Sequence, residues 1–195
     1  LTGDALIVLA YKVVASASLK DKTRLAQVLQ CISNGVGAPE GIVAGQAWEC
    51  ESKATLRQYQ KAKTGALFSA ATLSGALASG DLSNDWGLLG EALGEAYQVA
   101  DDIRDVIANP IELGKPTGQD ESLGRMSSAK ELGLSGAVDY FDDLINKAVL
   151  AVPDCRGAGK LRKLVRAESQ RLVPKKGPMR VSRSTKSPNK INISG

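Results

Sequence analysis

The chain has 195 residues, of which 43% are hydrophobic and 4% aromatic, and its formal net charge is +4 at pH 7. This length and apolar content suit one domain with a real core and exclude a disordered chain. No apolar run reaches the roughly 18 residues of a membrane span, and Leu1 opens into a structured pattern without a signal peptide. We therefore expect a cytoplasmic protein with no transmembrane segment and no nucleic-acid partner.

The sequence contains no His and three Cys. The absence of His excludes Ser-His and Cys-His nucleophilic catalysis and zinc sites of the His type. Cys31, Cys50 and Cys155 are widely spaced and form no C-x-x-C pair, so we expect buried, reduced thiols. Any chemistry must depend on carboxylates, Lys, Arg and metal.

Helical periodicity, together with abundant Ala and Gly, predicts an all-α fold. The expected helices cover residues 4–18, 22–35, 41–51, 52–79, about 84–109, 127–132, 135–152 and 156–173. A bend is expected near Thr64-Gly65 in the fourth of these helices, and Asn109-Pro110 ends the fifth. Residues 111–126 read as a loop.

The pattern fails from Pro174 onward, where Lys, Arg, Ser, Pro and Asn dominate. Such a composition cannot bury enough apolar surface to offset the entropy of ordering it. The sequence therefore predicts one domain over residues 1–173 and a basic, flexible and dispensable tail over residues 174–195.

Carboxylates gather at the end of the expected helix 84–109. Gln98, Asp101, Asp102 and Asp105 follow the i, i+3, i+4, i+7 rule and are expected on one helix face. Hard oxygen ligands of this kind suit Mg²⁺, which typically takes one or two carboxylates plus substrate phosphates. A solvated acidic face is the alternative.

Two further segments suit phosphate. Gly114 to Asp120 is rich in Gly and contains Lys115, so it could present backbone N–H groups and a cation, although an ordinary turn is the alternative. Lys63 and Thr64 place a cation beside a hydroxyl at the expected bend, although an ordinary helix bend is the alternative and is favoured for the tripeptide taken alone.

Five segments carry a family pattern in a specific order. They are L-T-G-D-A-L at residues 1–6, G-I-V-A-G-Q at 41–46, K-T-G-A-L-F at 63–68, Y-Q-V-A-D-D-I-R-D at 97–105 and G-K-P-T-G-Q-D at 114–120. In this order they resemble the trans-polyprenyl diphosphate synthase family. The resemblance is strongest to bacterial geranylgeranyl diphosphate synthases of carotenoid and bacteriochlorophyll pathways, and it covers about residues 1–173.

The resemblance implies an isoprenoid-synthase-type helical bundle that forms a homodimer. It implies Mg²⁺-dependent, head-to-tail condensation of isopentenyl diphosphate with an allylic diphosphate, giving geranylgeranyl or farnesyl diphosphate. By the same resemblance, metal would be held by Asp101, Asp102 and Asp105. Substrate binding and catalysis would fall to Lys63, Thr64, Gln98 and Lys115.

Departures from the family leave alternatives open. The first aspartate-rich motif and the basic residues that hold isopentenyl diphosphate in the family are absent from this sequence, and we expect a chain cut from a longer protein. Gln60 replaces a common His, and Gly124 to Ser127 replaces R-P-N or R-P-T. A noncatalytic subunit of a heteromeric synthase is one alternative. A terpene cyclase is another, although its N-S-E type metal motif is missing.

Overall fold

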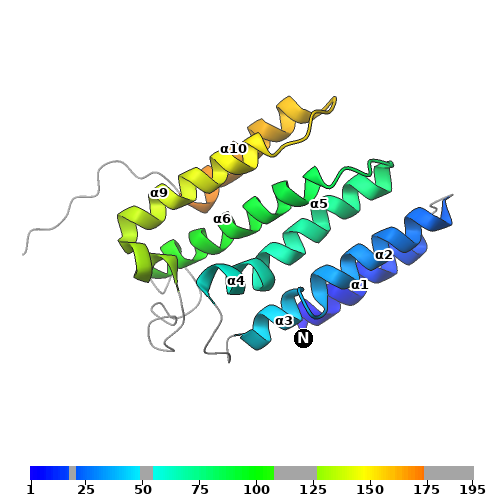
Figure 1. Cartoon of the computed structure of the whole chain (residues 1–195), viewed down its shortest axis with the longest axis horizontal. Coiled ribbons are helices and arrows are strands. Elements are labelled where there is room, and N and C mark those ends of the chain that lie inside the picture. Colours follow the sequence, from blue (N-terminus) through cyan, green and yellow to red (C-terminus); the bar gives the residue numbers. More distant parts are fainter. Residues whose placement is uncertain (18–20, 49–54, 108–126, 174–195) are drawn as a thin grey trace, which may run out of the picture.

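The computed structural model describes residues 1–17, 21–48, 55–107 and 127–173, and every regular element in these ranges is a helix (Figure 1). The elements are α1 (Thr2–Ser16), α2 (Lys22–Val36), α3 (Ile42–Ala47), α4 (Leu56–Gln60), the π-helix η2 (Lys61–Gly65), α5 (Ala66–Ser79), α6 (Asp85–Ile107), α9 (Ser128–Leu150) and α10 (Ala158–Leu172). The predicted all-α class is confirmed.

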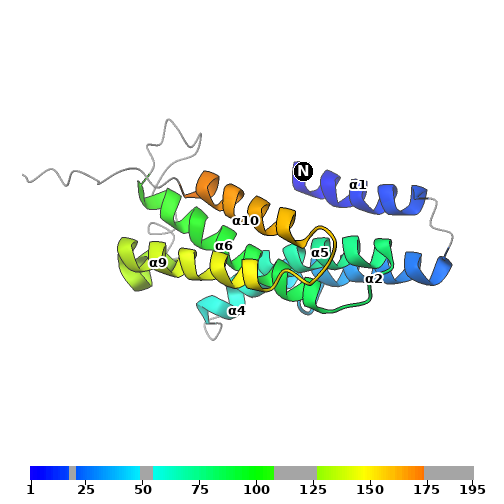
Figure 2. The same ribbon diagram turned by 90° about the horizontal axis from the view of Figure 1, so that it is seen from above.

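Helix α6 lies in the middle of the bundle. It packs against α9 on one side and α5 on the other, and α5 packs in turn against α2 (Figure 1). Figure 2 shows α1 and α10 on the same side of this row. The helix that carries the predicted aspartates is therefore held between α5 and α9.

The core forms where α6, α9 and α10 meet. On α6, Ala92, Ala96, Val99 and Ile103 recur at helical spacing and are at most 2% exposed. Phe141 is the large aromatic that α9 contributes to the same cluster. Because an apolar stripe with this period faces one direction, its burial fixes the rotation of α6 about its axis.

The expected helix 52–79 is not one regular helix. It consists of α4, η2 and α5 within the described residues, so the predicted bend near Thr64-Gly65 takes the form of a π-helix. The expected break between 127–132 and 135–152 is also present, as a kink at Gly133, whose φ is 69°. Ser127 caps α9, because its hydroxyl accepts from the N–H of Lys130.

Helix α1 carries apolar side chains that the rest of this chain leaves exposed. None of its residues is buried in this chain, and Leu6, Val8, Leu9 and Val13 are each at least half exposed. A hydrogen bond between the hydroxyls of Tyr11 and Ser33, 3.0 Å long, links α1 to α2.

The cysteine expectation was partly wrong. Cys31 and Cys155 are free, but neither is buried: Cys31 is half-buried, and Cys155 is exposed in the turn between α9 and α10. Cys50, the loop 111–126 and the tail 174–195 lie outside the described residues. None of the described helices combines the length and apolar character needed to cross a membrane.

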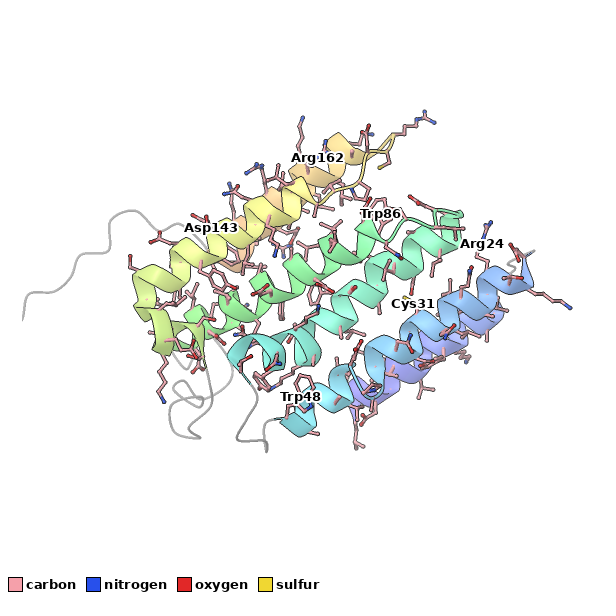
Figure 3. All side chains as sticks on the ribbon, in the orientation of Figure 1. Arg24, Cys31, Trp48, Trp86, Asp143 and Arg162 are labelled. Carbon is pink, nitrogen blue, oxygen red and sulfur yellow. The ribbon has the colours of Figure 1, made fainter. Side chains whose placement is uncertain are left out.

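The turn between α5 and α6 is closed by one carboxylate. Asp81 accepts hydrogen bonds from the N–H of Ser83 at 2.9 Å and from the indole N–H of Trp86 at 2.8 Å, and Trp86 lies near the start of α6 (Figure 3). These bonds, the backbone one first, hold the pKa of Asp81 below its ordinary value of 3.8.

We predict that Asp81→Asn lowers the melting temperature at neutral pH and that this difference disappears in acid. A group whose pKa is lowered by folding stabilises above its unfolded pKa, and that stability is lost as pH falls through the folded value. Melting curves of both proteins from neutral pH to below 3.8 test this. A constant difference across the range would contradict the assignment, and the exposed Asp143→Asn controls for charge.

Candidate functional site

Lys63 and Thr64 lie in the π-helix η2. A π-helix accommodates one extra residue per turn, is rare, and occurs frequently at functional sites. The ammonium of Lys63 donates to the hydroxyl of Tyr59 and lies 4.9 Å from the centre of its ring. Tyr59 is only 5% exposed, so a buried aromatic side chain holds the ammonium of the lysine in place.

Two glycines let neighbouring helices touch the backbone of η2. A Cβ on Gly45 of α3 would come within 2.5 Å of the Cα of Lys63, and one on Gly94 of α6 would lie 2.6 Å from the Cα of Gly65. No side chain fits at such distances. The π-helix is therefore in direct backbone contact with α3 and with α6, and the position of Lys63 and Thr64 depends on those contacts.

Thr64 and Gln98 are joined although 34 residues separate them. The Thr64 hydroxyl donates to Gln98 Oε1 at 3.0 Å, and Gln98 Nε2 donates to Asp102 Oδ1 at 3.1 Å. Three residues predicted independently from two motifs thus form one chain of hydrogen bonds between η2 and α6.

Asp102 occupies a different environment from the shared acidic face expected of it. It is 2% exposed, and its Oδ2 accepts from the backbone N–H of Ser128 at 2.7 Å and from the side chain of Gln60 at 3.4 Å. Gln60 also donates to the hydroxyl of Ser128 at 3.3 Å. Ser128 opens α9, so the carboxylate lies at the N-terminus of that helix, where a negative charge is favourable.

The other two aspartates are arranged separately. The side chain of Asp101 is 36% exposed and forms an ion pair of 3.3 Å with Arg104, whose guanidinium lies 5.9 Å from the centre of the Tyr97 ring. Asp105, one turn further along α6, is 8% exposed. The two are one helical turn apart, so their carboxylates point in similar directions.

Asp101 and Asp105 suit a hard divalent cation. Both offer oxygen ligands, and Mg²⁺ takes one or two carboxylates with the remainder from phosphates and water. Within the described part of the chain, no three Asp, Glu, Cys or His side chains are close enough to hold an ion by themselves. The donor set therefore fits Mg²⁺ that is completed by ligands from a substrate or another segment.

Sequence reasoning missed three residues of this site and named one that the structure does not test. Tyr59, Gln60 and Ser128 support Lys63 and Asp102. The i, i+4 spacing of Tyr59 to the lysine was one signal, and Gln60 was noted only as a departure from the family's common His. Ser128 joins the site through tertiary packing alone. Lys115 and its loop lie outside the described residues.

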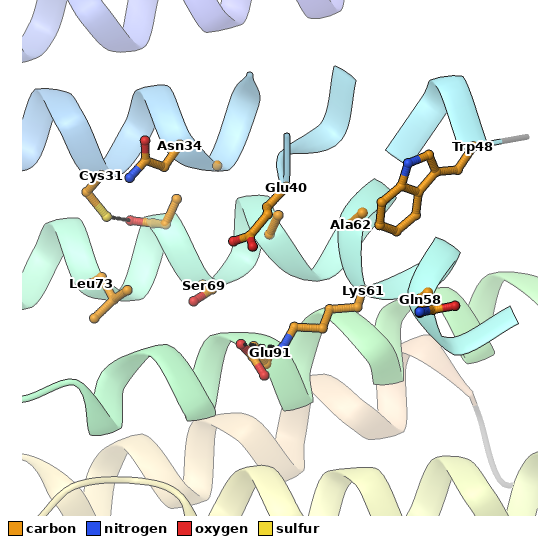
Figure 4. A pocket seen from close by; sticks show the side chains of 13 residues that line it. Cys31, Asn34, Glu40, Trp48, Gln58, Lys61, Ala62, Ser69, Leu73 and Glu91 are labelled. Atoms are coloured by element: carbon orange, nitrogen blue, oxygen red, sulfur yellow. Dashed lines mark hydrogen bonds and ion pairs between the residues drawn. The ribbon is translucent and has the colours of Figure 1, made fainter. Parts of the chain in front are cut away.

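A cavity of about 400 Å³ opens elsewhere, among α2, α5, η2 and α6 (Figure 4). Lys61 reaches across it to pair with Glu91 at 3.1 Å, Cys31 donates to the carbonyl of Ala70, and Trp48 stands at one end. None of the predicted site residues lines this cavity. It is therefore distinct from the Thr64–Gln98–Asp102 chain.

The described residues thus form an all-helical bundle in which the aspartate-rich helix α6 lies beside the π-helix that carries Lys63 and Thr64. Residues 1–143 match the family described as Polyprenyl synthetase. The chain belongs to the polyprenyl synthetase family.

The relatives agree with this assignment. The chain is 42% identical over 181 residues to geranylgeranyl diphosphate synthase of Cereibacter sphaeroides, covering 93% of this chain and 63% of the relative. It is 38% identical over 173 residues to the Rhodobacter capsulatus enzyme of the same name, covering 89% and 60%. The chain thus spans about three fifths of the length of these relatives.

A solved structure shows the same fold. A geranyltransferase from Helicobacter pylori, complexed with magnesium and isoprenyl diphosphate, aligns with a TM-score of 0.65 and 26% identity, covering 87% of this chain and 57% of that one. The predicted isoprenoid-synthase-type bundle is confirmed.

We predict that Gly45→Ala destabilises the protein by about 1 to 3 kcal/mol, because its methyl group meets the backbone of Lys63, which cannot turn aside. The matched control is Gly75→Ala on α5, where nothing lies within 4 Å of the added carbon. That change should stabilise by about 0.5 to 1 kcal/mol through helix propensity. Urea unfolding measures both, and equal effects would contradict the close contact at Gly45.

Proposed function

We propose that this chain forms the greater part of a Mg²⁺-dependent prenyltransferase that condenses isopentenyl diphosphate with an allylic diphosphate. The product we propose is geranylgeranyl or farnesyl diphosphate, since relatives in the same family carry both names. The observation that carries the proposal is the chain of hydrogen bonds from Thr64 through Gln98 to Asp102. This chain connects the π-helix η2 to the aspartate-rich end of α6. The homodimer rests on the family resemblance alone.

The reaction breaks the allylic C–O bond, lets the alkene of isopentenyl diphosphate attack the resulting carbon, and releases a proton to the departing diphosphate. None of these steps needs His. Lys63, held by Tyr59, supplies a fixed positive charge for the diphosphate. Lys115 is proposed for the same role from its place in the sequence.

Asp101 and Asp105 would hold the Mg²⁺. When bound, the metal supplies Lewis-acid stabilisation of the diphosphate leaving group. Asp101 forms an ion pair of 3.3 Å with Arg104. This cation holds the Asp101 carboxylate in place and offsets part of the negative charge of the neighbouring aspartates. Asp102 contributes by holding Gln98 beside Thr64.

We predict that Asp101→Asn lowers kcat by about a hundredfold or more in the complete protein, including any residues that precede Leu1. Loss of one metal contact in the transition state is worth several kcal/mol. Helicity by circular dichroism should not change, because the side chain is partly exposed. The control is Asp143→Asn on the outer side of α9. Normal turnover by the Asp101 variant would refute the metal assignment.

We further predict that Lys63→Ala lowers kcat/KM for the allylic diphosphate by roughly 2 to 4 kcal/mol, the scale of a desolvated charge contact. The kcat/KM for isopentenyl diphosphate should fall less. Steady-state kinetics with each substrate varied in turn measures both, and the exposed Lys163→Ala serves as control. An equal loss of kcat/KM for both substrates would argue against separate diphosphate sites.

A further inference from the structure

The hydrogen bonds from Thr64 to Asp102 all run in one direction. Thr64 Oγ1 donates to Gln98 Oε1, and Gln98 Nε2 donates to Asp102 Oδ1. The other oxygen of Asp102 accepts from the backbone N–H of Ser128 and from the amide of Gln60. Since N–H donors approach both of its oxygens, the carboxylate is the terminal acceptor of the chain.

This direction follows from the chemistry of each group. A carboxylate only accepts, so Gln98 must turn its NH₂ toward Asp102 and its carbonyl toward Thr64. An amide carbonyl also only accepts, so the Thr64 hydroxyl must donate its single proton to Gln98. The remaining side of Thr64 Oγ1 then offers lone pairs and no proton.

We propose that Asp102 is a positioning residue that sets, through Gln98, the direction of the Thr64 hydroxyl. The inference rests on the proposed function, in which Lys63 binds the allylic diphosphate and Thr64 is its neighbour in the same π-helix. An oxygen that presents lone pairs repels diphosphate oxygens and favours the carbon that becomes electron-poor as the C–O bond breaks. Asp102 thereby serves the reaction without touching substrate.

Asp102→Asn tests this because it changes hydrogen bonding without changing shape. The Asn oxygen must face the N–H of Ser128, which needs an acceptor, so the Asn NH₂ faces Gln98. The amide of Gln98 then turns over and presents its NH₂ to Thr64. Thr64 becomes the acceptor, and its proton is free to point toward the substrate.

Adding Gln98→Glu should restore the original direction. The glutamate accepts from the Asn NH₂ with one oxygen and from Thr64 with the other, and the total charge of the pair equals that of the natural protein. The double variant is therefore predicted to recover what the single variant loses. If Asp102 only stabilised the fold, the double variant would not recover activity.

In the complete protein we expect Asp102→Asn to lower kcat by about tenfold to a hundredfold with KM changed less than about threefold. The double variant should regain most of the loss, and Asp143→Asn should have no effect. In a Thr64→Val background, Asp102→Asn should lower kcat little further, because both changes act through the Thr64 hydroxyl. Additive losses without rescue would overturn the proposal.

A second readout needs no turnover. The side-chain NH₂ of Gln98, assigned in amide NMR spectra of this chain by its loss in Gln98→Glu, should shift when Asp102 becomes Asn. Thr64→Val should move these signals strongly in the Asp102→Asn protein and weakly in the natural one, because only in the former does NH₂ face Thr64. Signals that do not respond to Asp102→Asn would overturn the proposal.

The outcomes separate the two proposals. A complete protein without prenyl transfer would refute the proposed function, and the NMR result would still decide how Asp102 orients Gln98. Melting temperatures show whether each variant folds. If Asp102→Asn alone unfolds, a folded and active double variant supports the inference, whereas a double variant that also unfolds contradicts it.

Discussion

The site depends on one buried charge, the carboxylate of Asp102. At 2% exposure it is almost entirely buried, so its free energy depends strongly on the groups that donate to it. Those groups come from the end of α4, the same turn of α6 and the first residue of α9. The need to satisfy one anion therefore fixes three segments relative to one another, and Thr64 is connected to them through Gln98.

Small residues make that convergence possible. The backbone contacts at Gly45 and Gly94 bring α3 and α6 against η2, and Gly90 continues the close approach of α6 to α5, where a Cβ would lie 2.6 Å from the carbonyl oxygen of Phe68. Larger side chains would hold these helices further apart and lengthen the 3.0 Å bond between Thr64 and Gln98. Packing geometry thus determines whether the polar chain can form.

Periodicity predicted the helices well, since α2, α6 and α10 begin and end within about two residues of their expected bounds. It predicted the bend at Thr64 but not its π-helical form, because the extra residue is stabilised by contacts with α3 and α6 rather than by local sequence. The carboxylates of α6 were evident from their spacing. Gln60 and Ser128 were not, because their partnership with Asp102 spans 42 and 26 residues.

Helix geometry explains why the three aspartates differ in environment. At about 100° per residue, Asp101 and Asp105 lie about 40° apart around α6, whereas Asp102 lies about 100° from Asp101. Adjacent aspartates therefore leave the helix in different directions and meet different neighbours. The structure buries Asp102 against Ser128 and leaves Asp101 partly exposed beside Arg104. A D-D-x-x-D spacing in a regular helix thus gives its three carboxylates different surroundings, since Asp102 is bound by α9, Asp101 pairs with Arg104, and Asp105 is 8% exposed.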